Sequence, residues 1–178
     1  MDEATPIRLS KQTLHSLFIA GLGSDVKEHS DIVAAPLLVD LMPPFPLRIR
    51  AYLYNCTNPP GGRAPDEYKF QIILPGQQRG ARGVLDYSDG RTPVLAAYAR
   101  MTEEVEGGVF VMWDPYKHKE FAYSANMQVH ADTIIRALYE PVTTSRRSNG
   151  EIILAARPEH LAEALGMRVT TSLTEAMQ

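Results

Sequence analysis

The sequence predicts an α+β domain with a bent, mainly antiparallel sheet, or a partial β-barrel, and about three flanking helices. Three observations lead to this fold class. About six short apolar or alternating segments lie between turn residues, as strands do. A further three segments show features of helices, which are helical spacing of apolar residues or residues that start and stop helices. The two kinds of segment do not alternate strictly along the chain, so a doubly wound parallel sheet is disfavoured.

The predicted helices are recognised by their boundary residues as well as by their periodicity. The first follows Ser10, a good N-cap, and ends near Gly21. The second spans residues 131–139, where isoleucine and leucine recur at helical spacing. The third begins at Pro158, because proline is favoured in the first helical turn, and ends at Gly166.

The predicted strands are bounded by proline, glycine and polar turn residues. Residues 47–54 alternate apolar with basic or aromatic side chains, which predicts a half-buried strand whose outer face carries Arg48, Arg50, Tyr52 and Tyr54. Residues 33–40 predict either a strand or a short buried helix, since periodicity cannot separate the two. The remaining predicted strands are residues 68–74, 94–98, 109–113, 121–129 and 152–156.

Composition indicates a cytoplasmic domain without membrane segments. We assign residues 1–166 to one globular domain and residues 167–178 to a tail or the start of a linker to a missing domain. The longest apolar runs are too short to cross a bilayer. The single cysteine, Cys56, excludes an intramolecular disulfide and suits a reducing compartment. The net charge of −3 argues against a histone-like protein but permits a basic surface on one face.

One stretch, residues 68–90, organises the functional prediction. After its strand, the turn at Pro75 leads into a loop in which long donors alternate with glycines. Arginine and glutamine side chains can bond phosphates and the edges of bases, so this loop predicts contact with nucleic acid. The alternative is a solvated hairpin whose arginines pair with Asp86 and Asp89.

Two further polar segments add to this prediction, one around Lys117 and one at Arg146. Each alone is typical of an ordinary surface loop, but three such segments in one domain predict a shared double-stranded DNA surface if the fold brings them together. Tyr87 and Tyr123 lie among polar residues and are candidates for stacking on an unpaired base. The candidate DNA-binding residues are Lys69, Gln71, Gln77, Gln78, Arg79, Arg82, Tyr87, Ser88, Lys117, His118, Lys119, Tyr123, Ser124, Asn126, Arg146 and Arg147.

Three stretches carry a resemblance to a known family: YKFQIILPGQQRGARGVLDYSDG at 68–90, VFVMWDPYKHKEFAYSANMQV at 109–129 and RRSNGEIILAAR at 146–157. Together they resemble a small bacterial domain of restriction and DNA-modification systems, over about residues 47–166. In that setting the domain stands beside, or is fused to, nucleases and methylases. The resemblance implies a DNA-recognition role in bacterial defence and a fused or associated nuclease or methylase as partner, but it implies no particular contact residues.

The favoured function is therefore sequence- or modification-specific binding of double-stranded DNA, as the non-catalytic recognition domain of a restriction-modification enzyme. An alternative is a Mg²⁺-dependent restriction endonuclease using Glu67 and Lys69, with Asp40 or Asp66 as the second acid. A third is a protein-interaction or immunity module whose basic loops meet an acidic partner. Neither a metal site nor a cofactor is predicted, because a single cysteine and five scattered histidines give no ligand spacing.

Overall fold

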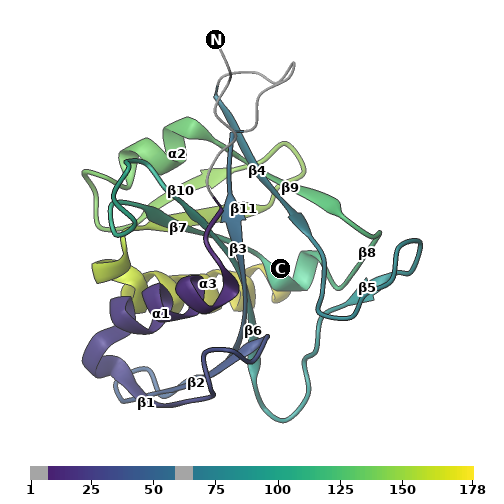
Figure 1. The fold of residues 1–178 in the computed structure, drawn as a ribbon, viewed down its shortest axis with the longest axis horizontal. Helices are drawn as coiled ribbons and strands as arrows, with labels where there is room; N and C mark the ends of the chain where they lie inside the picture. The colour runs from purple at the N-terminus through teal and green to yellow at the C-terminus, as the bar shows by residue number, and fades with distance from the viewer. Residues whose placement is uncertain (1–7, 59–65) are drawn as a thin grey trace.

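An open, seven-stranded mixed sheet forms the centre of the protein in a computed structural model that describes residues 8–58 and 66–178 (Figure 1). Every strand pairing in it is antiparallel except that of β3 with β6. The α+β prediction with a mainly antiparallel sheet is confirmed. In spatial order the strands are β1 (Val26–His29), β2 (Leu37–Leu41), β3 (Arg48–Cys56), β6 (Thr92–Ala99), β7 (Val109–Trp113), β11 (Ile152–Ala156) and β10 (Thr143–Arg146).

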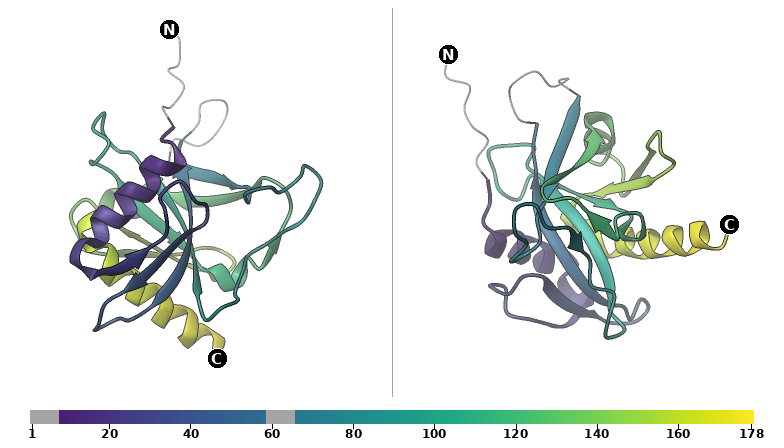
Figure 2. Two further views of the ribbon diagram at one scale, coloured as in Figure 1. Left: turned by 60° about the horizontal axis from the view of Figure 1, so that its bottom comes forward. Right: turned by 90° about the vertical axis from the view of Figure 1, so that its right-hand side faces the viewer.

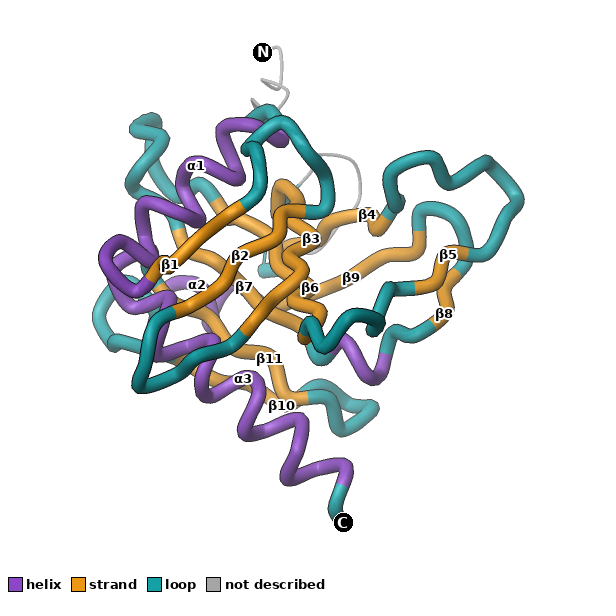
Figure 3. Tube along the Cα trace, turned by 90° about the horizontal axis from the view of Figure 1, so that it is seen from below, coloured by secondary structure: helices purple, strands orange, loops and turns teal. Residues whose placement is uncertain are grey.

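Two short antiparallel pairs lie outside this sheet. The pair of β4 (Glu67–Ile72) with β9 (Ala125–His130) is called the ribbon below, and β5 (Gly83–Val84) pairs with β8 (Glu120–Phe121). In Figure 3 both pairs extend to the side away from β1 and helix α1 (Lys11–Leu22). The ribbon is therefore a separate pair of strands that packs against the main sheet.

Two hydrophobic clusters occupy the two faces of the sheet. On one face, α1 and α3 (Leu161–Ala176) cover a cluster that includes Phe18, Phe110 and Leu165. On the other face, the ribbon and α2 (Ala131–Arg136) cover a cluster that includes Phe70 and Trp113. Because β6, β7 and β11 contribute to both clusters, they are almost wholly apolar, as doubly covered strands are.

The structure corrects the prediction that β3 is half-buried with an outer basic and aromatic face. Arg50, Tyr52 and Tyr54 are only 6%, 5% and 8% exposed. The ribbon and the segment around Asp86 cover this face, and the polar ends of the side chains are satisfied there. The Tyr54 hydroxyl donates to the carbonyl of Ile73 at 3.1 Å, and the Tyr52 hydroxyl accepts from the amide of Asp86 at 3.1 Å. Alternation in the sequence could not reveal this second covering layer.

The predicted end of the first helix is confirmed, but both predicted ends of the last helix are wrong. Helix α1 ends at Leu22, next to Gly21, where a Cβ atom would lie 2.7 Å from the Pro158 carbonyl oxygen, so this glycine serves close packing. Helix α3 begins at Leu161, after the 3₁₀ turn η3 (Pro158–His160), and runs through Gly166 to Ala176. Residues 167–176 are therefore helical, and Figure 2 shows the last turns extending past the sheet. Burial of Leu165, Arg168 and Ser172 on one side offsets the cost of glycine inside the helix.

The remaining differences are smaller. Helix α2 ends at Arg136, earlier than predicted, and of residues 33–40 only those from Leu37 onward are extended. Two further 3₁₀ turns are η1 (Gly23–Asp25) and η2 (Pro115–Lys117). In the part of the chain that the structure describes, no helix has the length and apolar character needed to cross a membrane.

Candidate nucleic-acid interface

The outer face of the ribbon is polar along its whole length. Strands alternate their side chains between two faces, and Phe70 and Met127 face the core while Gln71 and Asn126 are exposed. In the ribbon register, Gln71 stands opposite Asn126 and Lys69 opposite Gln128. The ammonium of Lys69 donates to Oδ1 of Asn126 at 3.1 Å. The ribbon thus presents three amides and Lys69 on one surface, with the pair of Glu67 and His130 at one end of it.

Aromatic residues hold this ribbon rigidly against the sheet. The ring of Phe70 stacks on Tyr54, with centroids 4.7 Å apart, and meets Trp113 edge-on at 5.0 Å. The indole of Trp113 donates to the backbone carbonyl of Gln128 at 3.0 Å. Trp113 is fully buried, and its indole bond is made to β9 itself. These contacts fix the register of the outer face, because a one-residue slip would turn Gln71 and Asn126 inward.

The predicted segment at Arg146 reaches one side of the ribbon. Arg147 donates from Nη2 to Oε1 of Gln128 at 3.4 Å and lies 3.9 Å from Glu151. Arg146 is exposed and donates to the carbonyl of Gly150. Residues of this turn and of the ribbon line a common pocket of about 270 Å³; they are Asp66, Glu67, Gln128, Val129, His130, Ser145, Arg146, Arg147, Ser148 and Ile153.

The basic loop at 117–119 lies next to the Arg147 turn, because both contact Glu151. Nε2 of His118 lies 2.7 Å from Oε2 of this buried carboxylate. Lys117 pairs with Glu175 of α3 at 3.6 Å. Lys119 is exposed, and its side chain makes no hydrogen bond or ion pair with residues 8–58 and 66–178. The loop is thus anchored to the rest of the fold by Lys117 and His118 and presents Lys119 to solvent.

The glycine-rich loop uses most of its donors on itself. The Gln77 side chain accepts from the amide of Leu74 and donates to the carbonyl of Ala81, both at 3.0 Å. Gln78 donates to the carbonyl of Gly76 at 3.3 Å. Arg82 pairs with Glu120 at 2.8 Å, across the β5–β8 pair. Gln77 and Gln78, which the sequence suggests as contacts to DNA, therefore also stabilise the loop itself.

Arg79 differs from its neighbours because it is exposed and has no ion pair within the described residues. Its neighbour Gly80 has φ +85°, and Gly83 packs so closely that an added Cβ would lie 2.4 Å from the Phe121 ring. The glycines of this loop thus serve its own path and packing. Arg79 is the side chain of the loop that remains available for an outside partner.

The candidates at 87–88 and 123–124 are partly engaged. The Tyr87 hydroxyl donates to the Pro115 carbonyl at 2.7 Å, and desolvation, followed by the influence of Tyr116, raises the pKa of Tyr87 to about 12. Ser88 donates to Asp86 at 2.6 Å. Tyr123 and Ser124 are half-buried. The acids Asp86 and Asp89 pair with Arg50, at 3.3 and 3.6 Å, and not with the arginines of the glycine-rich loop.

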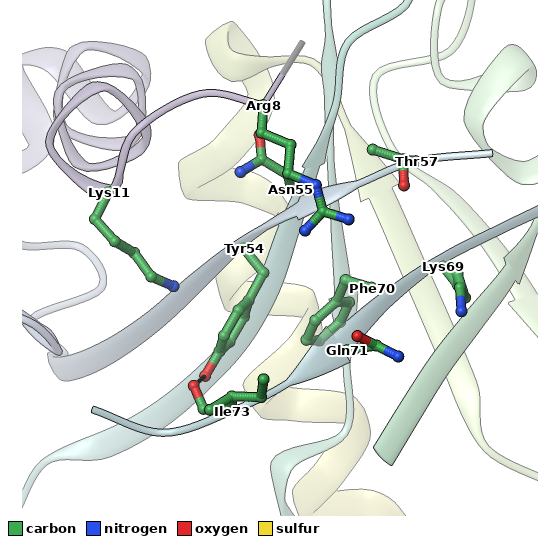
Figure 4. Close-up of a pocket in the computed structure, with 9 residues that line it drawn as sticks. All are labelled: Arg8, Lys11, Tyr54, Asn55, Thr57, Lys69, Phe70, Gln71 and Ile73. Carbon is green, nitrogen blue, oxygen red and sulfur yellow. Dashed lines mark hydrogen bonds between the residues drawn. The ribbon is translucent and has the colours of Figure 1, made fainter. Parts of the chain in front are cut away.

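The other side of the ribbon carries residues that the sequence did not single out. A pocket of about 350 Å³ lies between the start of α1, β3 and β4 (Figure 4). It shares Lys69 and Gln71 with the ribbon and adds Arg8 and Lys11, which are more than 50 positions away in the sequence. Hydrogen bonds between Leu9 and Asn55 join the segment at Arg8 to β3. The Thr57–Lys69 bridge and the stacking of Tyr54 on Phe70 join β3 to β4. No local sequence pattern predicts this pocket.

The residues of the nuclease alternative come together only in part. Glu67 and Lys69 lie on the same face of β4, and Asp66 lies 3.7 Å from His130 beside them. Asp40 instead belongs to β2, where it pairs with Arg91 at 3.0 Å. Within residues 8–58 and 66–178, no three His, Cys, Asp or Glu side chains are grouped so that they could hold a metal ion.

The fold and this surface define a class: a small α+β domain that displays a polar two-stranded ribbon flanked by cations. Comparison of the sequence with protein-family models identifies the particular family. Residues 47–165, which run from the start of β3 into α3, match the model described as Methylase-associated X1, and the chain belongs to this family. Searches found no match among curated proteins and none among solved structures. The expected link to methylases is thereby confirmed at the level of the family.

Proposed function

We propose that this protein binds double-stranded DNA through the outer face of the β4–β9 ribbon, as the recognition domain of a restriction-modification system in the cytoplasm. The observation that carries the proposal is the cross-strand arrangement of Lys69, Gln71, Asn126 and Gln128 on a rigid two-stranded platform. The major groove of B-DNA admits a two-stranded ribbon, and glutamine or asparagine can pair with the N6 and N7 positions of adenine.

Cations around the ribbon supply the contacts that position the duplex. Arg146 and Arg147 lie on one side, next to Gln128. Arg82 pairs with Glu120, the residue after Lys119. We also assign Arg79, Arg82, Lys117 and Lys119 to phosphates. Phosphate contacts fix register without reading sequence, whereas base contacts specify it. In this proposal the amides of the ribbon contact base edges, and the surrounding cations contact phosphates.

The family context supports a recognition role in partnership with a methylase or nuclease. The chain is a member of a methylase-associated family. A recognition domain must display readable polar groups, and the exposed amides of Gln71 and Asn126 on the ribbon support that role. Whether the target is a sequence or a modified base is decided by the same amides, since a modification in the major groove changes the donors and acceptors they meet.

The test is a selection of bound duplexes from a random DNA library, run with unmodified and modified pools, followed by affinity measurements with the variant Gln71→Ala/Asn126→Ala. We expect an enriched site and a loss of about 1–3 kcal/mol in discrimination for each base pair that an amide reads. Binding to unrelated duplexes should change little. Gln178→Ala, which removes an exposed amide at the other end of the described chain, is the matched control.

Failure to bind any member of the library would overturn the proposal. Cleavage of plasmid DNA in Mg²⁺ that Glu67→Ala abolishes would instead establish the nuclease alternative, for which the shared face of Glu67 and Lys69 is the supporting observation. Binding in which the double variant and Gln178→Ala behave alike would remove the ribbon from the interface.

A further inference from the structure

The pocket at the start of α1 brings Arg8 and Lys11 together. Its nine lining residues include no Asp or Glu. Helix α1 also has no acidic residue in its first turn. Figure 4 shows the side chains of Arg8 and Lys11 reaching toward β3 and β4 from the segment that precedes and begins α1. The residues that line this pocket therefore carry positive charge and no negative charge.

Arg8 and Lys11 are held in place by β3. The amide of Leu9 donates to Oδ1 of Asn55 at 2.8 Å, and Nδ2 of Asn55 donates back to the carbonyl of Leu9 at 2.9 Å. Ser10 then caps α1 by accepting from the amide of Thr13 at 3.1 Å. Both functions of the Asn55 amide are thus used to fix the backbone between the two cations, so the pocket is built before any ligand arrives.

The ammonium of Lys11 is partly desolvated, and no carboxylate of the described residues compensates for this. Its ammonium lies 3.7 Å from the centroid of the Tyr54 ring and also donates to the carbonyl of Leu53. Within the described residues it has no ion pair with a carboxylate. Burial lowers the pKa of Lys11 from 10.5 to about 8. A partly desolvated cation that lacks a counter-ion favours the binding of an anion.

The wall of the pocket strengthens that preference. Tyr54 and Phe70, which are stacked and buried, form its apolar side. Low-dielectric walls concentrate the field of nearby charges, so an anion here would interact with Arg8 and Lys11 more strongly than at an open surface. The polar side, which includes Thr57 and Gln71, opens toward the ribbon. Arginine suits phosphate oxygens in particular, because its planar group can bond two of them at once.

We propose that the pocket lined by Arg8, Lys11 and Thr57 binds a phosphate group of the DNA strand that passes the ribbon. This inference rests on the proposed function, and it adds a contact that fixes the duplex on the side of the ribbon opposite Arg146. The same chemistry would accept the phosphate of a free nucleotide, and the experiment separates these two sources.

The test compares the wild-type protein with Arg8→Gln/Lys11→Met in the full chain, with Lys27→Met on β1 as a matched control. Affinity for several duplexes is measured by fluorescence anisotropy across a range of salt concentrations. We expect the double variant to lose about tenfold in affinity, because charged hydrogen bonds are removed. The loss should be similar for every sequence, and the slope of log affinity against log salt should fall by about one. Thermal melts check that the variants fold.

The outcomes separate this inference from the proposed function. If the double variant keeps wild-type affinity and salt slope while Gln71→Ala/Asn126→Ala loses discrimination, the phosphate pocket is wrong and the DNA-binding proposal stands. If the wild-type protein binds no DNA, that proposal fails, and titration with deoxyadenosine monophosphate followed by NMR decides the pocket. Saturable binding that the double variant loses would retain it as a nucleotide phosphate site, and no binding would overturn it.

Discussion

Two groups of cations in this protein have opposite surroundings. Arg50, Arg91 and Arg168 lie against carboxylates: Arg50 against Asp86 and Asp89, Arg91 against Asp40, and Arg168 against Asp114. Arg8 and Lys11 line a pocket without any acid. The first group joins segments of the fold to one another. Among residues 8–58 and 66–178 the second group has no carboxylate partner, which is why we assign it a partner outside the chain.

The contrast shows that counting basic residues is a weak guide to a binding surface. Arg50 alternates with apolar residues just as a surface arginine would, yet it is 6% exposed. Lys11 is exposed as a residue, yet its ammonium lies against an aromatic ring. What distinguishes the structural arginines is a side chain that is itself buried with a carboxylate within reach, and that depends on the fold.

The comparison is tested most severely at Arg168. This residue is 2% exposed; it lies 3.7 Å from the buried Asp114 and donates to the carbonyl of Ile152. Arg168→Ala would leave Asp114 buried without its cation, so we expect a loss of about 3–5 kcal/mol in the free energy of unfolding. Urea denaturation measures it. A loss below 1 kcal/mol would show that Ser172, which donates to Asp114 at 3.1 Å, satisfies the carboxylate by itself.

Arg50→Ala should have the next largest effect. Arg50 donates to the backbone carbonyls of Asp86 and Ser88, at 3.0 and 3.3 Å, in addition to its two ion pairs. Because the carboxylates of Asp86 and Asp89 are 51% and 79% exposed, water replaces the lost partner there. We expect a loss of about 1.5–3 kcal/mol in unfolding free energy. Equal losses for Arg50→Ala and the exposed control Lys27→Ala would contradict a structural role.

Unlike the two arginine substitutions, Lys11→Met should not reduce stability at neutral pH. The folded-state pKa of Lys11, about 8, lies below the ordinary value of 10.5, so the unfolded chain binds the proton more tightly. The contribution of Lys11 to the free energy of unfolding therefore rises with pH between about 8 and 10.5. Below pH 8 the charged, partly buried lysine lowers the stability of the folded state. We expect Lys11→Met to be at least as stable as the wild type at pH 7, with the wild type gaining relative to it toward pH 10. Urea denaturation at both pH values tests the sign, and a relative gain toward low pH would refute it.

The smallest effect is expected at Arg82, whose pair with Glu120 is exposed on both sides. The two side chains are 60% and 58% exposed. Pairs of this kind contribute about 0.2–1 kcal/mol to stability, so Arg82→Ala should leave the melting temperature almost unchanged. Any larger role of Arg82 must then appear in DNA affinity. A marked loss of stability would place Arg82 with the structural cations.

The sequence by itself determined the fold class and most of the strands, because periodicity and turn residues are local properties. Shared motifs in the three polar segments were also enough to indicate the family. Tertiary structure alone decided which residues face outward together. The pairing of β4 with β9 places Gln71 beside Asn126, and the bridge from Thr57 to Lys69 carries β3, with the segment at Arg8, to the ribbon. Contacts between distant segments depend on strand order and covering layers, which no local pattern encodes. For the same reason the glycine-rich loop, prominent in the sequence, proved to be braced largely by its own glutamines.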